Sequence, residues 1–201
     1  LANAYSFMKT LKLASLFGIL GIVSAWLTIA ISSYLNPWFS LEANALSDLG
    51  GGNLTANGHP APTLPIVYDG GLIITSVLLI IFASLMVSIS RNRIEGSGFS
   101  FFIISGIFLA LIGIYHEGTY PHDFVSIWFF ILASISYGTI SVGVMKLGDL
   151  IPGSLMLTTI LASWIIYALV PWKSVAEGEI FGITVVDALV LIHLFFFKQE
   201  G

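Results

Sequence analysis

Long apolar runs separated by short polar connections dominate this chain of 201 residues. A helix needs about 20 consecutive apolar residues to cross the hydrocarbon core of a bilayer. Six runs approach this length, and breaks such as Asn36-Pro37 and Arg91-Asn92-Arg93 separate them. No strand-like alternation is sustained, which excludes a transmembrane β-barrel. The pattern predicts an all-α, polytopic six-helix membrane bundle with spans at about 13–35, 70–90, 99–115, 126–145, 154–170 and 180–197.

Composition supports the bilayer as the solvent of this chain. Hydrophobic residues make up 57% of the sequence and charged residues 9%, against roughly 25% charged in a typical soluble domain. The absence of cysteine excludes disulfides, thiolate metal sites and cysteine nucleophiles. Seven basic residues spread along the chain argue against nucleic-acid binding. We therefore expect membrane lipids, and other membrane-protein subunits, as partners.

The first residues allow two interpretations. Met8-Lys9-Thr10 resembles a natural start, so residues 1–7 are either an added remnant or a longer native N-terminus. The apolar run that follows is too long for a signal peptide, and no small-residue cleavage site precedes the next loop. We interpret it as a retained first span of a single membrane domain.

Basic residues predict the orientation, because cytoplasmic connections carry the excess of Lys and Arg. A six-span arrangement places Lys173 on one side and six basic residues on the other. The prediction is a plasma-membrane protein with both termini in the cytoplasm and the loop 36–69 outside. The inner connections 91–98 and 147–153 are expected to be simple turns. The six residues on the inner side are Lys9, Lys12, Arg91, Arg93, Lys146 and Lys198.

The most polar stretch, residues 44–52, lies in the long outer loop and ends in three glycines. Glycine permits positive φ and close backbone approach. Such a loop can fold back into the mouth of the bundle, with Asp48 facing a pocket. Alternatively, Ser47 and Asp48 form an Asx turn or a helix cap. The same loop contains a glycosylation sequon, Asn53-Leu54-Thr55.

Two histidine–carboxylate pairs, His116-Glu117 and His122-Asp123, occupy the second outer loop. Imidazole with carboxylate suits zinc, manganese or iron. The spacing matches no standard zinc motif, however, and sequence neighbours diverge on a helix. We therefore assign no metal ligand and no cofactor. A general alternative is that outer loops are acidic by default, because positive charge is retained inside.

Asp187 lies within the sixth predicted span, roughly 10 Å below its outer end. Intramembrane carboxylates usually face the bundle interior or a water-filled cavity. Polar faces of the fourth span (Ser134, Tyr137) and the fifth span (Ser163) are its expected partners. His193 is six residues further on and points elsewhere, either toward the inner surface or to a neighbouring helix.

Several loop motifs resemble a known family. Asn44 to Gly50 resembles the N-x-I-S-D-L-G signature of the six-span DUF998 proteins, and Gly118 to Asp123 resembles their G-x-F-P-x-D motif. Glu179 matches their late acidic position. Many members place a histidine near the start of the fourth span, where this chain has Ser126 or Trp128.

The motifs are also similar to the Frag1/DRAM/Sfk1 group, whose S-D-x-G loop is followed by a histidine and a later Phe-Phe pair. Here His122, Phe129 and Phe130 fit that spacing. The resemblance implies a fold and an outer site without a settled reaction. Relatives in the wider group are linked to lipid remodelling and membrane trafficking.

These observations leave three hypotheses, with enzyme activity open. The first is an outward-facing acidic and histidine pocket that binds or modifies a lipid or other amphiphile by general acid–base chemistry, which requires the outer loops to touch. The second is a structural or accessory subunit, and the third a small transporter using Asp187. Catalytic candidates are Asp48, His122, Asp123 and Glu179, and binding candidates are Asn44, Ser47, Asp69, His116, Glu117 and Asp187.

Overall fold

The computed structural model describes residues 2–51 and 58–199, and all regular structure within those residues is helical. Each of the six α-helices found there is long and apolar enough to cross a membrane. The predicted all-α, six-span fold is confirmed, and the chain is a multi-pass integral membrane protein. The elements are α1 (Ala2–Leu35), the 3₁₀ helix η1 (Leu46–Leu49), α2 (Ile66–Ser88), α3 (Arg93–Ile114), α4 (His122–Lys146), α5 (Leu150–Leu169) and α6 (Val175–Gln199).

Some helices begin in polar sequence ahead of their apolar runs. The side chain of Asn92 accepts hydrogen bonds from the N–H groups of Ile94 and Glu95, at 3.0 and 2.9 Å. This cap satisfies donors that have no partner in the first helical turn, so α3 begins at Arg93. α6 likewise begins at Val175, and Glu179 is already helical. The sequon at Asn53 lies outside the described residues.

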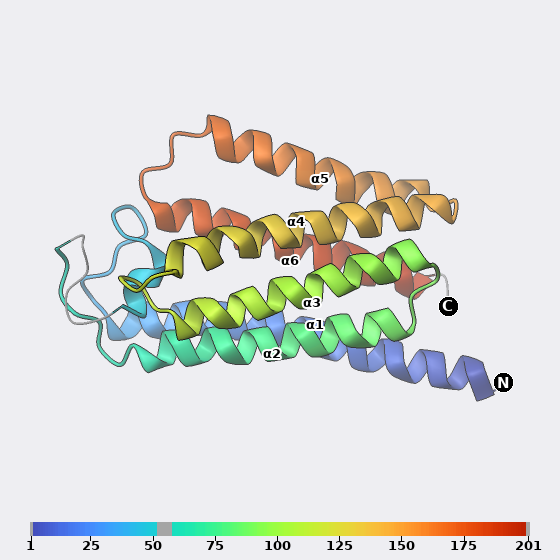
Figure 1. Cartoon of the computed structure of the whole chain (residues 1–201), viewed down its shortest axis with the longest axis horizontal. Coiled ribbons are helices and arrows are strands. Elements are labelled where there is room, and N and C mark those ends of the chain that lie inside the picture. Colours follow the sequence, from blue (N-terminus) through green and yellow to red (C-terminus); the bar gives the residue numbers. More distant parts are fainter. Residues whose placement is uncertain (1, 52–57, 200–201) are drawn as a thin grey trace.

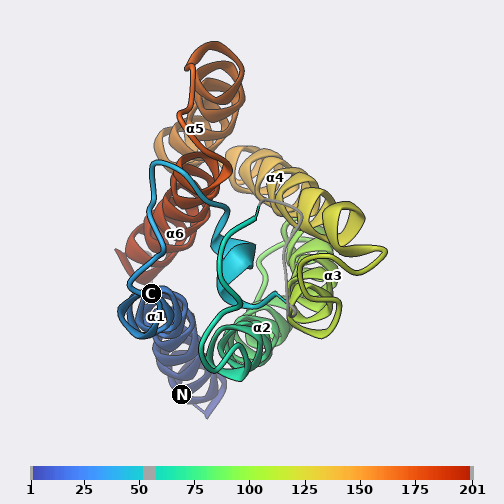
Figure 2. The ribbon, with the colours of Figure 1, turned by 90° about the vertical axis from the view of Figure 1, so that its left-hand side faces the viewer.

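Five helices form a ring and the sixth packs outside it. Viewed along the bundle, α1, α2, α3, α4 and α6 surround a central axis, and α5 contacts α4 and α6 from outside (Figure 2). Both chain termini lie at one end, the terminus end, together with the connections 89–92 and 147–149 (Figure 1). The opposite end, the loop end, carries the described parts of the first connection, 36–51 and 58–65, and the connections 115–121 and 170–174.

Small residues bring neighbouring helices of the ring close together. A Cβ atom on Gly98 of α3 would lie 2.9 Å from the Ser136 carbonyl of α4. The Ser136 hydroxyl in turn donates to the Gly98 carbonyl at 2.9 Å, and that of Ser105 donates to the Phe129 carbonyl at 3.0 Å. In lipid, where no hydrophobic effect drives helices together, such close packing and interhelical hydrogen bonds hold the bundle.

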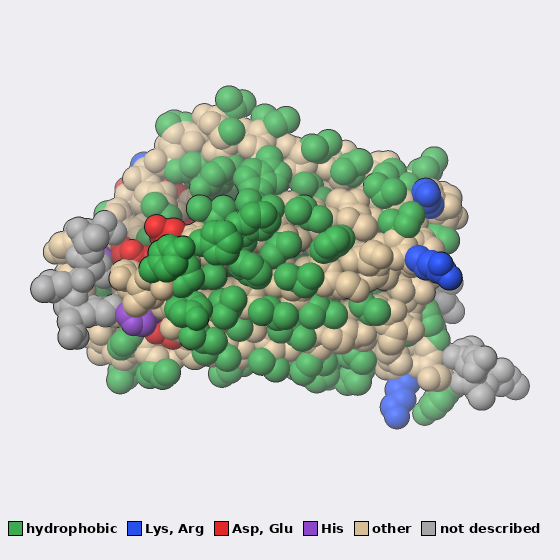
Figure 3. Space-filling model, viewed as in Figure 1, with side chains coloured by type: hydrophobic (Ala, Val, Ile, Leu, Met, Phe, Trp, Pro, Cys, Tyr) green, Lys and Arg blue, Asp and Glu red, His purple; other side chains and the backbone are tan. Residues whose placement is uncertain are grey.

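Polar and apolar side chains are sorted along the bundle axis. Hydrophobic side chains cover the long side in view, most of the visible Lys and Arg side chains stand at the terminus end, and the visible Asp, Glu and His side chains gather at the loop end (Figure 3). An apolar belt between two polar ends is what a bilayer requires. The loop end is therefore where the candidate residues collect.

Candidate functional site

The first long loop turns back into the ring and closes its loop end. Residues 44–50, here called the plug, carry η1, and all four η1 residues are buried. Figure 2 shows η1 in the middle of the ring. The plug is fastened to α6, because the Ala176 N–H donates to the Asn44 carbonyl at 2.9 Å. The loop thus forms the roof of the bundle interior.

Asp48 organises the plug from within. Its Oδ2 accepts the Ala45 N–H at 2.9 Å and the Asn44 amide at 3.4 Å, which closes the first turn of η1. Its Oδ1 lies 2.9 Å from Nε2 of His59, whose ring stacks on Trp38 with centroids 4.4 Å apart. Asp48 is fully buried, so its carboxylate acts as an anchor within the loop.

Gly50 is needed for space. Its φ of −108° is open to any residue. A Cβ atom there, however, would overlap the Asp69 carboxylate and come within 2.8 Å of the Tyr68 ring. The glycine therefore lets the plug lie directly on the first turn of α2, which is the close approach expected of this loop.

Ser47 links the plug to the second outer loop. Its hydroxyl donates to Oε2 of Glu117 at 3.0 Å, and the same oxygen lies 3.3 Å from Nε2 of His122. His122 is buried and begins α4, and its Nδ1 lies 2.6 Å from the Tyr115 carbonyl. Ser47, Glu117 and His122 thus form one polar chain across the loop end.

Glu179, in the second turn of α6, joins the plug to that helix. Its Oε2 accepts the Leu46 N–H at 2.7 Å, at the start of η1. Because Leu46 and Ser47 are neighbours, Glu179 and Glu117 both bind the first turn of η1. The first outer loop also contacts the third, because the Ser174 hydroxyl donates to the Leu41 carbonyl, so the first loop touches both of the others.

Two hollows meet at Glu179. Beneath the plug a cavity of about 70 Å³ lies inside the ring, lined by residues of η1, α1, α2, α3, α4 and α6. A larger apolar groove of about 340 Å³ runs between α4, α5 and α6. Phe130, Glu179 and Val186 line both hollows. The groove on the outside of the ring and the cavity within it are therefore separated by these three side chains.

Asp187 lines the central cavity, as expected of an intramembrane carboxylate. Its Oδ2 accepts a hydrogen bond of 2.8 Å from the indole N–H of Trp26 in α1. Of the partners expected on the fourth and fifth spans, Tyr137 interacts electrostatically with Asp187, but the hydrogen bond comes from α1. The ring places α1 beside α6, whereas Ser134 and Ser163 line the groove on the other side.

The remaining candidates lie around this centre. Asp69, in the first turn of α2, lies against Gly50. Asp123 is exposed in the first turn of α4. His116 is half-buried, and its Nδ1 lies 2.9 Å from the Glu117 carbonyl. His59 was not among the candidates, although a histidine in the same loop as Ser47-Asp48 is the signal that could have suggested it.

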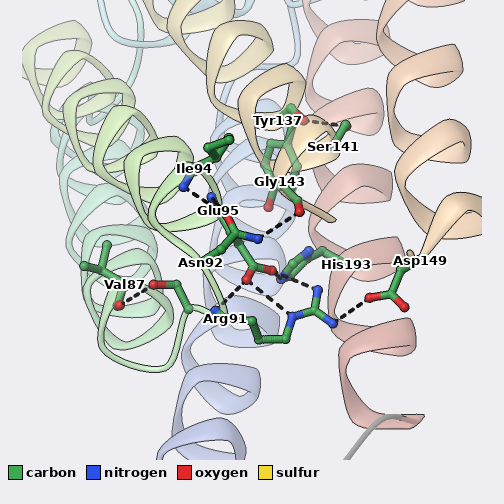
Figure 4. A network of polar contacts seen from close by, with 11 residues as sticks. Val87, Arg91, Asn92, Ile94, Glu95, Tyr137, Ser141, Gly143, Asp149 and His193 are labelled. Atoms are coloured by element: carbon green, nitrogen blue, oxygen red, sulfur yellow. Dashed lines mark hydrogen bonds and ion pairs between the residues drawn. The ribbon is translucent and has the colours of Figure 1, made fainter. Parts of the chain in front are cut away.

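Sequence analysis missed a second polar cluster, at the terminus end. Arg91 donates to the buried carboxylate of Glu95 at 3.0 Å and to Asp149 at 2.9 Å (Figure 4). Its guanidinium also lies 4.7 Å from the Phe197 ring. Nε2 of His193 in α6 lies 3.7 Å from Glu95. The connections expected to be simple turns therefore tie α2, α3, α5 and α6 together. An arginine four residues before an acid was the available signal.

Comparison with known proteins identifies a family. No curated protein and no solved structure was found to match. A family model described as "Protein of unknown function (DUF998)" matches residues 19–195, which include the plug, the second outer loop and Glu179. The likeness to the Frag1/DRAM/Sfk1 group stays a prediction. The chain is an integral membrane protein that belongs to the DUF998 family.

Proposed function

We propose that this protein binds a lipid or another amphiphile, with the apolar chain in the groove between α4, α5 and α6 and the polar head group at Glu179. The observation that carries the proposal is the position of Glu179, a carboxylate that lines both the apolar groove and the cavity under the plug. An amphiphile needs this combination of an apolar channel and a polar group at one end.

The groove has the size and lining of a ligand site. Its volume of about 340 Å³ falls in the range of roughly 300–1,000 Å³ found for small-molecule pockets. Its walls are mostly aliphatic and aromatic, and the Trp164 indole of α5 donates to the Ser134 hydroxyl of α4 at 3.1 Å. Because α5 packs outside the ring, the groove lies where bilayer lipid can reach it.

The chemistry of the polar end favours a head group that donates hydrogen bonds. Oε2 of Glu179 accepts the Leu46 N–H, and among the described residues no hydrogen bond reaches its Oε1. A hydroxyl or ammonium group is the complement of that oxygen. Glu117 and His122 lie on the far side of the same turn, and acid–base chemistry by these groups, together with Asp123, is the enzymatic form of the proposal.

The proposal includes an orientation, with the loop end outside the plasma membrane and both termini in the cytoplasm. It rests on the positive-inside rule and the six basic residues predicted to lie opposite Lys173. The chain has no cysteine, so a cysteine introduced at one position is the only thiol that a maleimide can label. In intact cells a membrane-impermeant maleimide should label Glu42→Cys and not Lys146→Cys, and the opposite pattern contradicts the orientation.

The groove is tested by blocking it. A lipid with a diazirine on its acyl chain should cross-link to α4, α5 or α6 of the purified protein in nanodiscs. Ser163→Trp fills the groove and should remove most of that labelling. Ile165→Trp, on the same helix but outside the groove lining, is the matched control and should leave it unchanged. Equal labelling of both variants contradicts the proposal.

The head-group site is tested by Glu179→Gln, which keeps an acceptor for the Leu46 N–H and removes the charge. Loss of a charged hydrogen bond costs about 1.5–3 kcal/mol, so affinity for an amine- or hydroxyl-bearing lipid should fall about 10-fold or more. Affinity for the acyl chain alone should not change. If Glu179→Gln binds amine- or hydroxyl-bearing lipids as tightly as the unmodified chain does, the head group does not bind at Glu179.

Asp187 supports a second candidate, a small transporter. It lines the central cavity and is held by Trp26, and intramembrane carboxylates often mark ion or proton pathways. Ion flux in proteoliposomes that is lost in Asp187→Asn would support transport. Stable co-purification with a larger membrane protein would instead support the accessory-subunit alternative.

A further inference from the structure

Three side chains capable of binding a metal ion converge at the loop end. One ligand atom each from Glu117, His122 and Asp123 lies within 4.8 Å of the other two. We propose that this trio binds a divalent first-row metal ion. Their spacing in sequence suggests no metal motif, because the turn between loop and helix is what brings Glu117 back to the first turn of α4.

The geometry of His122 points to a cation between it and the carboxylates. Nδ1 lies 2.6 Å from the Tyr115 carbonyl, and a carbonyl only accepts, so Nδ1 carries the hydrogen. A neutral ring then presents the Nε2 lone pair to Oε2 of Glu117, 3.3 Å away. In that tautomer the Nε2 lone pair and the carboxylate oxygen can bind the same cation. A backbone carbonyl on the other ring nitrogen is also the usual support of a metal-binding histidine.

A second histidine–carboxylate contact at the loop end, between His59 and Asp48, differs from the trio in the number of acids. Nε2 of His59 lies 2.9 Å from Asp48, and that carboxylate is enclosed by the N–H groups of its own turn. At His122 the distance is longer and a second carboxylate, Asp123, joins the first. The His59 pair therefore joins one imidazole to one carboxylate inside the loop, whereas the trio combines one imidazole with two acids around a common point.

The ligand set and its surroundings define the class of ion. Two carboxylates with one imidazole suit zinc, manganese or iron. Ligands bound at about 2.1 Å in a tetrahedral site lie about 3.4 Å apart, so the trio must close slightly. Asp123 is exposed and free of helix packing, so it can move that distance. The Ser47 hydroxyl orients Glu117, and three protein ligands leave further positions for water or a ligand oxygen.

The test measures metal binding by the full chain in lipid-free detergent after treatment with a chelator, so it is independent of the amphiphile proposal. Titration calorimetry with Zn²⁺ and with Mn²⁺ should give one ion per chain. Asp123→Asn and His122→Gln should each weaken binding about 10-fold or more. Glu42→Gln changes an exposed acid of the first outer loop, which pairs with Lys173 outside the trio, and should stay within about twofold of the unmodified chain.

A second measurement holds even where His122→Gln disturbs folding. Nitrogen-15 spectra of the intact chain should show a neutral His122 ring with hydrogen on Nδ1, and added Zn²⁺ should shift Nε2. A ring that is doubly protonated with and without zinc identifies a plain ion pair and overturns the proposal. Absence of saturable binding at millimolar metal, or equal binding by Asp123→Asn and the unmodified chain, overturns it as well.

Discussion

The two ends of the bundle use buried charge differently. At the terminus end, the fully buried Glu95 is matched by Arg91, which also reaches Asp149. At the loop end, Asp48, Glu117 and Glu179 are held instead by histidines, a hydroxyl and backbone N–H groups. At the terminus end, the protein itself therefore supplies the cation that pairs with the buried Glu95 carboxylate. The second arrangement gathers three acids at one end of the bundle, with Glu179 lining two hollows, and none of the three pairs with Lys or Arg among the contacts given for the described residues.

This difference separates a structural cluster from a binding site. A buried ion pair costs desolvation, which is repaid only with a close partner and additional hydrogen bonds. Glu95 has both, since the Arg91 backbone N–H also donates to it at 2.8 Å. Glu179 faces a groove and a cavity, where a ligand can supply the missing donor. We therefore expect the terminus end to respond to mutation in stability and the loop end in binding.

The largest effect is expected from Arg91→Met. It leaves Glu95 buried without its cation, and breaking one partner of a buried pair costs about 3 kcal/mol or more. Thermal unfolding in detergent, followed by fluorescence, should show a clear fall in midpoint. Arg93→Met, at an exposed position on the same turn, should change little. Similar stability of the two variants would break the comparison between the ends.

Gly50→Ala should be next in size. The added methyl group meets the Asp69 carboxylate and the Tyr68 ring, and overpacking of this kind costs about 1–3 kcal/mol. The plug should move away from the first turn of α2, so hydrogen exchange of the backbone amides at residues 44–50 should become faster. Gly138→Ala is the control, because its Cβ meets nothing within 4 Å and alanine favours a helix. Unchanged exchange in Gly50→Ala would contradict the fit of the plug against α2.

Asp48→Asn should loosen the plug by about 1–2 kcal/mol. The amide keeps an acceptor for the Ala45 N–H but loses the charge opposite His59. Hydrogen exchange in the plug is again the measurement, with lipid cross-linking as the functional readout. Glu42→Gln removes an acid at the same end that pairs with Lys173 in the open. Exposed pairs contribute little, so this control should behave like the unmodified chain.

The smallest effect is expected from Trp26→Phe. It keeps an aromatic ring in α1 and removes the hydrogen bond to Asp187, which costs about 1 kcal/mol. Melting of the detergent-solubilised protein should shift slightly, and flux, where present, should change with it. A shift as large as that of Arg91→Met would mean that Asp187 is structural in the way that Glu95 is.

The sequence predicted the fold well and the site in part. Apolar runs of bilayer length indicated six helices, and the polar loop between the first two led to Ser47 and Asp48. The role of Asp48 was open, because a sequence does not show that His59 comes back over it. The partner of Asp187 was missed for a related reason. Helical periodicity places the carboxylate on a face, but the order of helices around the ring decides that Trp26 is opposite.

The terminus-end cluster was missed because each of its members has an ordinary explanation alone. Arg91 fits a positive inner connection, Glu95 a first helical turn and Asp149 a short turn. Their meeting requires α3, α5 and α6 to bring their ends to one point. Contacts between residues far apart in sequence depend on helix packing, which no local pattern contains.

The sequence by itself determined the solvent of the chain and the distribution of its charges: a bilayer-crossing α-helical chain with most of its acids and histidines in the loops predicted to lie outside. These follow from hydrophobicity and charge, which act residue by residue. Only the tertiary structure decided that the plug enters the ring, that Glu179 meets Leu46 and lines two hollows, and that Glu117 joins His122. Those contacts depend on where six helices place three loops, and it is there that the proposed chemistry of this protein lies.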